Sequence, residues 1–181
     1  MTLRWTAVIV AVVALSAVPV TFAAPPSASP TANQQSPGQR CSAQLAAVGA
    51  SAFKQLYAQD VNANQKNAFG KCVSKLTAQD QQNANKASAL CRAEQADAGF
   101  AAVHSSKTFD QLYGTGKNLK NAFGNCVSSK SNAAAQQQQQ STIKAAKTCR
   151  TLQKTSLGTF TSTYGTKKNA FGKCVAAHTN A

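Results

Sequence analysis

The chain has 181 residues, which is enough for one ordinary domain or for several small ones. Its 19 basic residues outnumber its 5 acidic residues and give a formal net charge of +14. That excess favours anionic partners such as wall polymers, acidic polysaccharide, nucleic acid or lipid headgroups, although it could also serve only to keep the protein soluble.

The first 23 residues have the three-part pattern of a secretory signal peptide. Arg4 supplies the charged start, residues 6–20 form an apolar run, and small residues around Ala23 suit a cleavage site. An uncleaved membrane anchor is the alternative, but the run falls short of the ~20 apolar residues that a spanning helix needs, and Pro19 interrupts its end. Cleavage would remove one base, leaving 18 basic and 5 acidic residues and a charge of +13. We therefore expect a secreted or cell-envelope protein.

The composition changes sharply along the rest of the chain. Residues 24–39 are rich in proline and serine and predict a disordered linker. From residue 38 onward there is no proline, and Ala, Gln, Lys and Asn dominate, which favours helix, whereas strand signals are absent. We predict an all-α fold of three tandem, small, disulfide-stapled helical hairpins, preceded by the signal peptide and the linker.

One short phrase occurs three times. It reads KNAFGKCV at residues 66–73 and 168–175 and KNAFGNCV at residues 120–127, so seven of its eight positions are identical in all copies. A Phe-x-x-x-Tyr pair precedes each copy, and a cysteine precedes that pair. The gap from this tyrosine to the second phenylalanine shrinks from 12 to 10 to 7 positions, so loop length varies while the anchors stay. The three units are residues 40–76, 90–130 and 148–178.

Local signals predict how the helices of each unit run. The first cysteine and the apolar residues after it recur at near-helical spacing and predict one apolar stripe on an amphipathic face, as in Cys41, Leu45, Val48, Phe53 and Leu56. The i, i+4 spacing of the Phe and Tyr stacks both rings on one side of a helix, in the pairs Phe53–Tyr57, Phe109–Tyr113 and Phe160–Tyr164. Glycine follows the tyrosine where a left-handed C-terminal cap favours it, at Gly114 and Gly165 but not at Ala58. The asparagines of the phrase are predicted helix N-caps: Asn67, Asn121 and Asn169.

The segments between units, residues 74–90 and 128–148, are polar and have helix-forming composition. They could be solvated helices that run into the next unit, or looser tethers. We predict helices, and one long rod-like helix joining each pair of units is the alternative architecture.

All six cysteines follow the predicted signal peptide, and an even count in an exported chain indicates a disulfide framework. A unit of about 35 residues buries little apolar surface, and one disulfide closing such a loop contributes roughly 3–4 kcal/mol. Because each unit has one early and one late cysteine, we predict the bonds Cys41–Cys72, Cys91–Cys126 and Cys149–Cys174. The competing scheme joins neighbouring units through Cys72–Cys91 and Cys126–Cys149.

The titratable residues do not form a recurring catalytic pattern. None of the acidic residues or histidines after the signal peptide recurs in all three units: Asp60, Asp80, Glu94, Asp97, Asp110, His104 and His178. Asp97 and His104 could share a helix face, but surface polarity explains both. No GxSxG, HExxH or phosphate-binding glycine loop occurs, and no CxxC pair suggests zinc. We predict that the protein is not an enzyme and has neither cofactor nor metal.

Lysines beside the repeated phrase are the better candidates for a site. In a stacked array they could form a basic stripe near helix N-termini, which favour anions: Lys66, Lys71, Lys117, Lys120, Lys167, Lys168 and Lys173. The alternative is that they are only solvated residues, and Asn125 in place of a lysine argues against a strict electrostatic role. An anionic cell-wall polymer or polysaccharide fits better than nucleic acid, because no exposed aromatic residues are left to stack bases.

The phrase, with the Phe-x-x-x-Tyr-Gly segment and an upstream cysteine, resembles uncharacterised secreted bacterial proteins with cysteine-containing NAFGKCV repeats. Phe160, Tyr164, Gly165 and residues 168–175 match most closely. The resemblance implies bacterial export and a repeat architecture, but no activity, ligand or catalytic residue.

Three functional hypotheses follow. The first is a non-catalytic, secreted or envelope-associated basic protein that binds anionic polymers. The second is a purely structural extracellular spacer. The third is a membrane-active cationic protein, which would need an exposed amphipathic face.

Overall fold

The computed structural model describes residues 35–57 and 67–179, and helices dominate both ranges. The helices are α1 (Pro37–Val48), α2 (Ala50–Tyr57), α3 (Ala68–Ala96), α4 (Phe100–Val103), α5 (Phe109–Tyr113), α6 (Ala122–Thr155), α7 (Leu157–Tyr164) and α8 (Ala170–Thr179). No strand occurs in the described ranges, so the predicted all-α class is confirmed. The predicted signal peptide, residues 24–34 of the linker, Ala58 and Lys66 lie outside them. The linker prediction is wrong for residues 37–39, which form the first turn of α1 because Ser36 caps the helix and Pro37 suits its first position.

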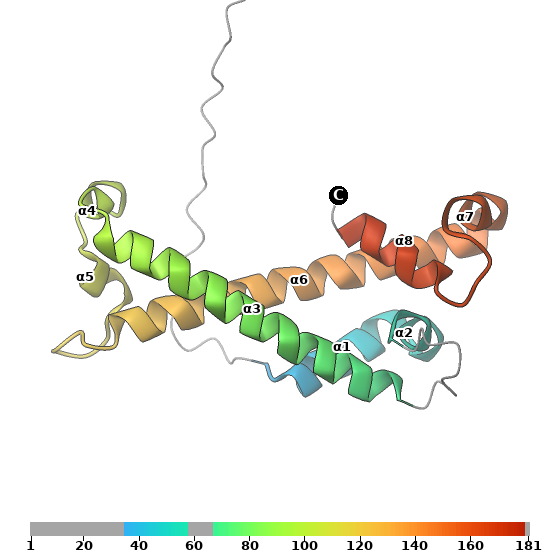
Figure 1. Cartoon of the computed structure of the whole chain (residues 1–181), viewed down its shortest axis with the longest axis horizontal. Coiled ribbons are helices and arrows are strands. Elements are labelled where there is room, and N and C mark those ends of the chain that lie inside the picture. Colours follow the sequence, from blue (N-terminus) through green and yellow to red (C-terminus); the bar gives the residue numbers. More distant parts are fainter. Residues whose placement is uncertain (1–34, 58–66, 180–181) are drawn as a thin grey trace, which may run out of the picture.

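Two long helices form the frame of the molecule. α3 has 29 residues and α6 has 34, which correspond to lengths of about 44 Å and 51 Å at 1.5 Å per residue. They contain the segments 74–90 and 128–148, so the predicted helical state of these segments is confirmed. Each long helix carries the second half of one unit and the first half of the next, as in the alternative architecture. Figure 1 shows that α3 and α6 cross while running in opposite directions.

The antiparallel course of α3 and α6 determines which units meet. Units 1 and 3 share one hydrophobic core, in which the Cys41–Cys72 and Cys149–Cys174 bonds lie together with Phe53, Phe160 and Phe171. Unit 2 has a separate core around Cys91, Cys126, Phe100 and Phe109. In Figure 1, α1, α2, α7 and α8 gather toward one end and α4 and α5 form the other. The three repeats therefore do not fold as three independent units in a row.

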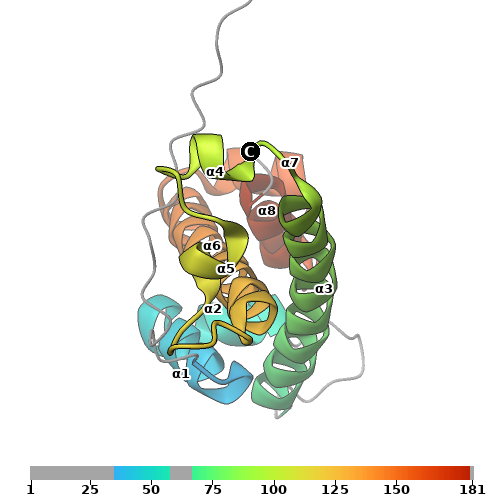
Figure 2. The same ribbon diagram turned by 90° about the vertical axis from the view of Figure 1, so that its left-hand side faces the viewer.

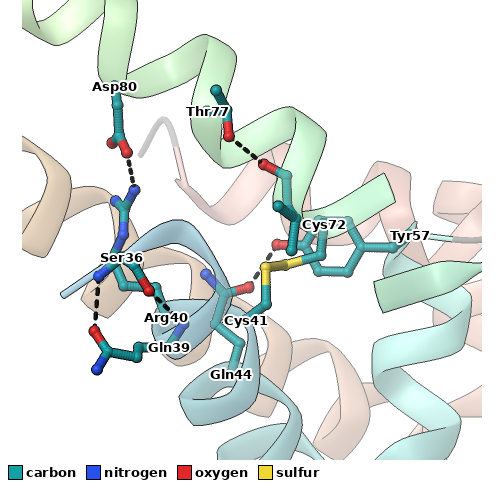
Figure 3. Close-up of a disulfide and its surroundings, with 10 residues drawn as sticks. Ser36, Gln39, Arg40, Cys41, Gln44, Tyr57, Cys72, Thr77 and Asp80 are labelled. Carbon is teal, nitrogen blue, oxygen red and sulfur yellow. Dashed lines mark hydrogen bonds and ion pairs between the residues drawn. A yellow bond between two sulfur atoms is a disulfide. The ribbon is translucent and has the colours of Figure 1, made fainter. Parts of the chain in front are cut away.

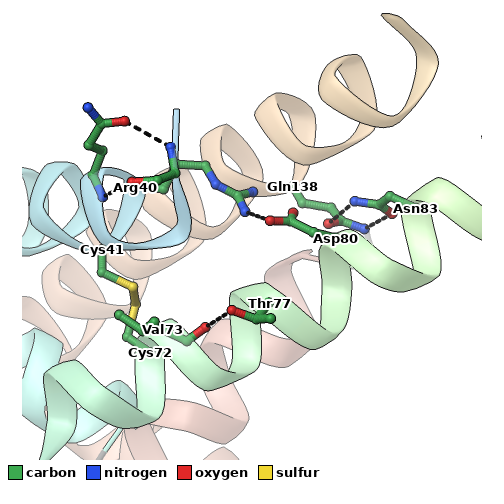
Figure 4. Close-up of polar contacts among 10 residues, drawn as sticks. Arg40, Cys41, Cys72, Val73, Thr77, Asp80, Asn83 and Gln138 are labelled. Atoms are coloured by element: carbon green, nitrogen blue, oxygen red, sulfur yellow. Dashed lines mark hydrogen bonds and ion pairs between the residues drawn. A yellow bond between two sulfur atoms is a disulfide. The ribbon is translucent and has the colours of Figure 1, made fainter. Parts of the chain in front are cut away.

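The middle of the molecule is held by a polar contact between the long helices. The buried residues of α3 recur every four residues along one face, with one gap of seven: Ala68, Cys72, Leu76, Asn83, Ala87 and Cys91. Asn83 is only 4% exposed, and its amide donates to Gln138 Oε1 at 3.1 Å while Gln138 Nε2 donates to Asn83 Oδ1 at 3.2 Å. Figure 4 shows this reciprocal pair beside the Arg40–Asp80 ion pair. α3 and α6 also lie close together when viewed from the α4–α5 end (Figure 2).

The predicted disulfide pairing is confirmed. Cys41–Cys72, Cys91–Cys126 and Cys149–Cys174 have sequence separations of 31, 35 and 25 and Cα–Cα distances of 6.0, 6.0 and 5.9 Å. All six cysteines have 0% exposure. Each bond joins the early helix of its unit to the helix that carries the repeated phrase, as Figure 3 shows for Cys41–Cys72.

The first half of unit 1 does not form one uninterrupted helix. Gly49 has a φ of 81°, a conformation that favours glycine, and it separates α1 from α2. Unit 3 breaks in the same place, at Ser156 between α6 and α7. The apolar residues from Cys41 to Leu56 are thus divided between two helices, and the break lets both helices turn toward one core.

The predicted glycine caps are half correct. Gly165 ends α7 with a φ of 88°, so a glycine at a positive φ is confirmed there. Gly114 has a φ of −73° and a ψ of 149°, so the left-handed cap predicted for it is wrong. Glycine is needed at this position for a steric reason instead, because a Cβ on residue 114 would lie 2.7 Å from the Cβ of Leu119.

The predicted N-caps have the right positions but not the predicted hydrogen bonds. Asn67 and Asn121 precede α3 and α6, yet neither side chain accepts a helix N–H. Their ψ angles of 17° and 6° depart from the extended conformation of a capping residue. Asn121 Oδ1 instead accepts from Thr115 N at 2.9 Å and fixes the loop, and the Oδ1 of Asn169 is buried without a partner.

Candidate functional site

The predicted site lysines fall into two groups at opposite ends. Lys117 and Lys120 lie in the α5–α6 loop of unit 2, whereas Lys71, Lys167, Lys168 and Lys173 lie with the shared core of units 1 and 3 (Figure 1). They therefore do not line one continuous stripe. In unit 2, Asn125 replaces a lysine and donates to Tyr113 O at 2.9 Å, which ties the start of α6 to the end of α5.

The basic charge is distributed unevenly about the Asn83–Gln138 pair. We call the described residues 35–57, 67–82 and 139–179 the shared-core end, and residues 84–137 the unit-2 end. The shared-core end holds eleven basic residues and one acid, Asp80, a net charge of +10. The unit-2 end holds six basic residues and three acids, a net charge of +3. The basic residues of the shared-core end are Arg40, Lys54, Lys71, Lys75, Lys144, Lys147, Arg150, Lys154, Lys167, Lys168 and Lys173.

Ion pairs remove little of this charge from the shared-core end. Asp80 pairs with the buried Arg40, and Lys130 Nζ lies 2.8 Å from Glu94 Oε1 at the unit-2 end. Apart from Lys71, no other basic residue of the described ranges has an acidic partner within salt-bridge distance. Eight lysines of this end are therefore exposed and have no acidic partner in the described ranges: Lys54, Lys75, Lys144, Lys147, Lys154, Lys167, Lys168 and Lys173.

The C-terminal half of α6 supplies an exposed basic face. Lys144, Lys147 and Lys154 are all exposed, and their spacings of three and seven residues place them on one side of the helix. Arg150 has a structural contact, because its Nη1 donates to Val48 O at the end of α1 over 3.0 Å.

Each unit anchors its tyrosine hydroxyl with a different polar residue. Tyr57 donates to Gln44 (Figure 3), and Tyr113 donates to Glu94 Oε2 at 3.0 Å. Both acceptors lie three residues after the first cysteine of their unit. Unit 3 has Leu152 there, and the hydroxyl of Tyr164 instead lies 3.3 Å from Nε2 of His178. His178 therefore contacts the tyrosine of its own unit.

Burial and charge alter the pKa values of this group of residues. Burial raises the pKa of Tyr57 to about 12, although the Gln44 hydrogen bond and Arg40 oppose the rise. Burial also raises the pKa of Tyr113, with Lys130 opposing and Glu94 adding to the rise. For Lys130, burial lowers the pKa, but the Glu94 carboxylate and Tyr113 outweigh it and raise it above its ordinary value. These groups stabilise their own units.

Several hollows lie between the helices. One of about 340 Å³ is lined by Lys167 and Lys168 near α7, and a second of about 340 Å³ by Lys75 and Lys173 beside α8. No acidic residue lines either hollow, and both belong to the shared-core end. At the unit-2 end, a hollow of about 280 Å³ is lined by Glu94, Asp97 and Asp110. The two ends thus offer hollows of opposite charge.

The two histidines of the described ranges lie in separate surroundings. The idea that Asp97 and His104 share a helix face is wrong, because Asp97 ends α3 and His104 ends α4. His104 stacks on Phe100 with ring centroids 3.9 Å apart. Cys149, Cys174 and His178 lie within 4.8 Å of one another, but the two sulfurs are bonded to each other and only the imidazole could ligate a metal.

Two structural roles were not anticipated from the sequence. Phe100 lies outside the repeated motif, yet it is 4% exposed and packs at 5.7 Å from the Phe109 ring. Phe69, which belongs to the motif, is 41% exposed. The acceptors Gln44 and Glu94 could have been found by their constant offset from the first cysteine.

Comparisons of the chain with protein-family models, with curated proteins and with solved structures found no match. Among the described residues, no helix has the length and apolar character needed to cross a membrane. Three disulfides are compatible with an extracellular protein, because such bonds persist in oxidising environments.

Proposed function

We propose that this is a non-catalytic, secreted or envelope-associated protein that binds anionic polymers through its shared-core end. One observation carries the proposal: this end has a net charge of +10 in its described residues, against +3 at the other end. A concentrated field of one sign attracts polyanions and raises their association rate. If the protein is exported, as its N-terminal pattern predicts, a wall polymer or an acidic polysaccharide is the polyanion that it would meet.

The exposed face of α6 gives the most direct test. The triple variant Lys144→Gln/Lys147→Gln/Lys154→Gln removes three solvent-directed charges without touching a core. We expect its affinity for heparin and for linear polyphosphate to fall roughly tenfold at ~0.1 M salt and to depend less steeply on salt. Neutral dextran should bind to neither protein.

A matched control removes the same charge from the unit-2 end. Arg92, Lys107 and Lys117 are exposed there, and their triple change to glutamine should leave polyanion affinity within about twofold of the parent, since a Debye length of ~10 Å at ~0.1 M salt screens them from the other end. Equal losses in both triple variants, or binding that ignores salt, would contradict the proposal.

The structural-spacer hypothesis remains the alternative, and the elongated α3–α6 frame favours it. It predicts that neither triple variant changes any binding. A membrane-active role needs a continuous apolar face, whereas the exposed large apolar residues of the described ranges, Phe69, Leu90, Val103 and Leu157, are spread over several helices. Release of dye from anionic vesicles would support that third role instead.

A further inference from the structure

Residues of three chemical kinds line the hollow beside α7: apolar, neutral polar and cationic. It has a volume of about 340 Å³ and lies among the end of α6, α7, the α7–α8 loop and Gln55 of α2. We call it the α7 hollow. Small-molecule sites begin at roughly 300 Å³, so this hollow has room for one small unit rather than for a length of polymer.

One wall of the α7 hollow is apolar. Phe160 and Phe171, which are almost fully buried, and Leu157, which is 58% exposed, all line it. An exposed leucine beside two buried aromatic rings gives a surface against which the C–H groups of a ligand can pack. A simple inorganic anion would leave this wall unused.

A second wall consists of neutral hydrogen-bonding groups. Gln55, Gln153, Thr161 and Thr166 come from three separate parts of the chain and line the same space. Amides and hydroxyls can both donate and accept, which is the requirement for binding the hydroxyl groups of a sugar or polyol.

The third wall is cationic. Lys167 and Lys168 line the hollow, no acidic residue does, and neither lysine has an acidic partner within salt-bridge distance in the described ranges. Unit 2 lacks this arrangement, because Leu119 precedes Lys120 where Lys167 precedes Lys168. Two adjacent lysines without an acidic neighbour in the hollow favour an anionic ligand group here.

We propose that the α7 hollow is a subsite for one anionic sugar or polyol unit, either phosphorylated or carboxylated. The anionic group binds Lys167 and Lys168, the hydroxyls bind the neutral wall, and the C–H face packs on Leu157. The inference rests on the proposed function, since such a unit would be one residue of the bound polymer. The α7 hollow would then make the binding specific, whereas the α6 face attracts the polymer by charge.

The test is a titration of the full mature chain with glucose 6-phosphate and with glucuronate, followed by calorimetry and by NMR shifts. We expect saturable one-to-one binding of at least one of them, and of inorganic phosphate at least tenfold more weakly. Leu157→Glu should weaken binding at least tenfold, as should Lys167→Gln/Lys168→Gln. The arms with glucose 6-phosphate and glucuronate distinguish phosphate from carboxylate.

Matched controls separate the subsite from overall charge. Leu90→Glu makes the same change at the unit-2 end, where Leu90 is 56% exposed in the C-terminal half of α3. Lys86→Gln/Lys107→Gln removes two charges from the same end. Both should keep the parent affinity, and melting curves establish that all four variants are folded.

The other possible results distinguish failure of the subsite from failure of the proposed function. If polymer binds but neither sugar does, or if Leu90→Glu weakens sugar binding as much as Leu157→Glu, the subsite is overturned while the proposed function stands. If inorganic phosphate binds as well as the sugars, the hollow recognises charge alone and the subsite is again overturned. If neither polymer nor sugar binds, both proposals fail.

Discussion

At the scale of single residues, one repeated tyrosine meets three different environments. Tyr57 reaches a neutral amide, Tyr113 a carboxylate that also pairs with Lys130, and Tyr164 an imidazole. The aromatic ring is retained because it packs on its phenylalanine, with centroids about 5 Å apart in each unit. The hydroxyl must then find whichever polar group its unit offers, because a buried hydroxyl without a partner is costly.

Tyr57 makes the protein sensitive to high pH. Its folded pKa of about 12 lies above the ordinary value of 10.0, so the folded state holds the proton more tightly than the unfolded state does. The contribution is fully present below pH 10 and is lost as the pH rises through 12, a loss on the order of 3 kcal/mol. We expect tyrosinate absorbance after a rapid pH jump to show one component with a midpoint near 12.

Tyr57→Phe tests the assignment of that component. The variant should lose the component with the highest midpoint and show a smaller fall in melting temperature between pH 10 and 12. In strong denaturant the component should vanish from the parent as well. A titration of the folded variant indistinguishable from that of the parent would disprove the assignment.

At the scale of helices, the polar composition of the inter-unit segments has a structural explanation. A segment rich in Ala and Gln lacks large apolar residues, but it forms helix readily, and its small side chains let α3 and α6 approach. Asn83 takes a position on the buried face of α3 that apolar residues occupy elsewhere. A single buried amide pair of this kind can fix the register of two helices.

The amide pair should show an asymmetric response to mutation. Gln138→Ala leaves the buried amide of Asn83 without a partner and should cost about 1–3 kcal/mol of unfolding free energy, whereas Asn83→Ala frees an exposed glutamine to bind water and should cost about 0.5–1.5 kcal/mol. Chemical denaturation measures both. Gln137→Ala, an exposed neighbour, is the matched control and should be nearly silent. If Gln138→Ala also leaves the free energy of unfolding nearly unchanged, the pair has no structural role.

At the scale of the whole molecule, α3 leads from unit 1 to unit 2, and α6 leads back from unit 2 to unit 3 beside unit 1. This course brings units 1 and 3 together and leaves unit 2 with a core of its own. It also places most of the basic charge at one end. Each end therefore has a core and a charge of its own, and the binding that we propose would belong to one end rather than to a single repeat.

The separate cores predict different effects of disulfide removal. Cys91→Ala/Cys126→Ala should cost about 4 kcal/mol by the chain-entropy model and should loosen unit 2 alone. Hydrogen exchange should then rise in α4 and α5 while α1, α2 and α8 stay protected. Cys41→Ala/Cys72→Ala should instead raise exchange across both unit 1 and unit 3, because they share a core. A uniform rise in both variants would contradict the division into two cores.

The sequence by itself determined the helical class, the three units and the disulfide pairing. These follow from local causes: composition sets helix propensity, and repetition assigns each early cysteine a late partner. The sequence also located the candidate lysines, but not their grouping. Only the tertiary structure decided that Lys167 and Lys168 lie far from Lys117 and Lys120, that Phe100 is buried while Phe69 is exposed, and that units 1 and 3 meet. Those outcomes depend on where two long helices cross, and that crossing is set by side-chain contacts between residues such as Asn83 and Gln138, which lie 55 positions apart.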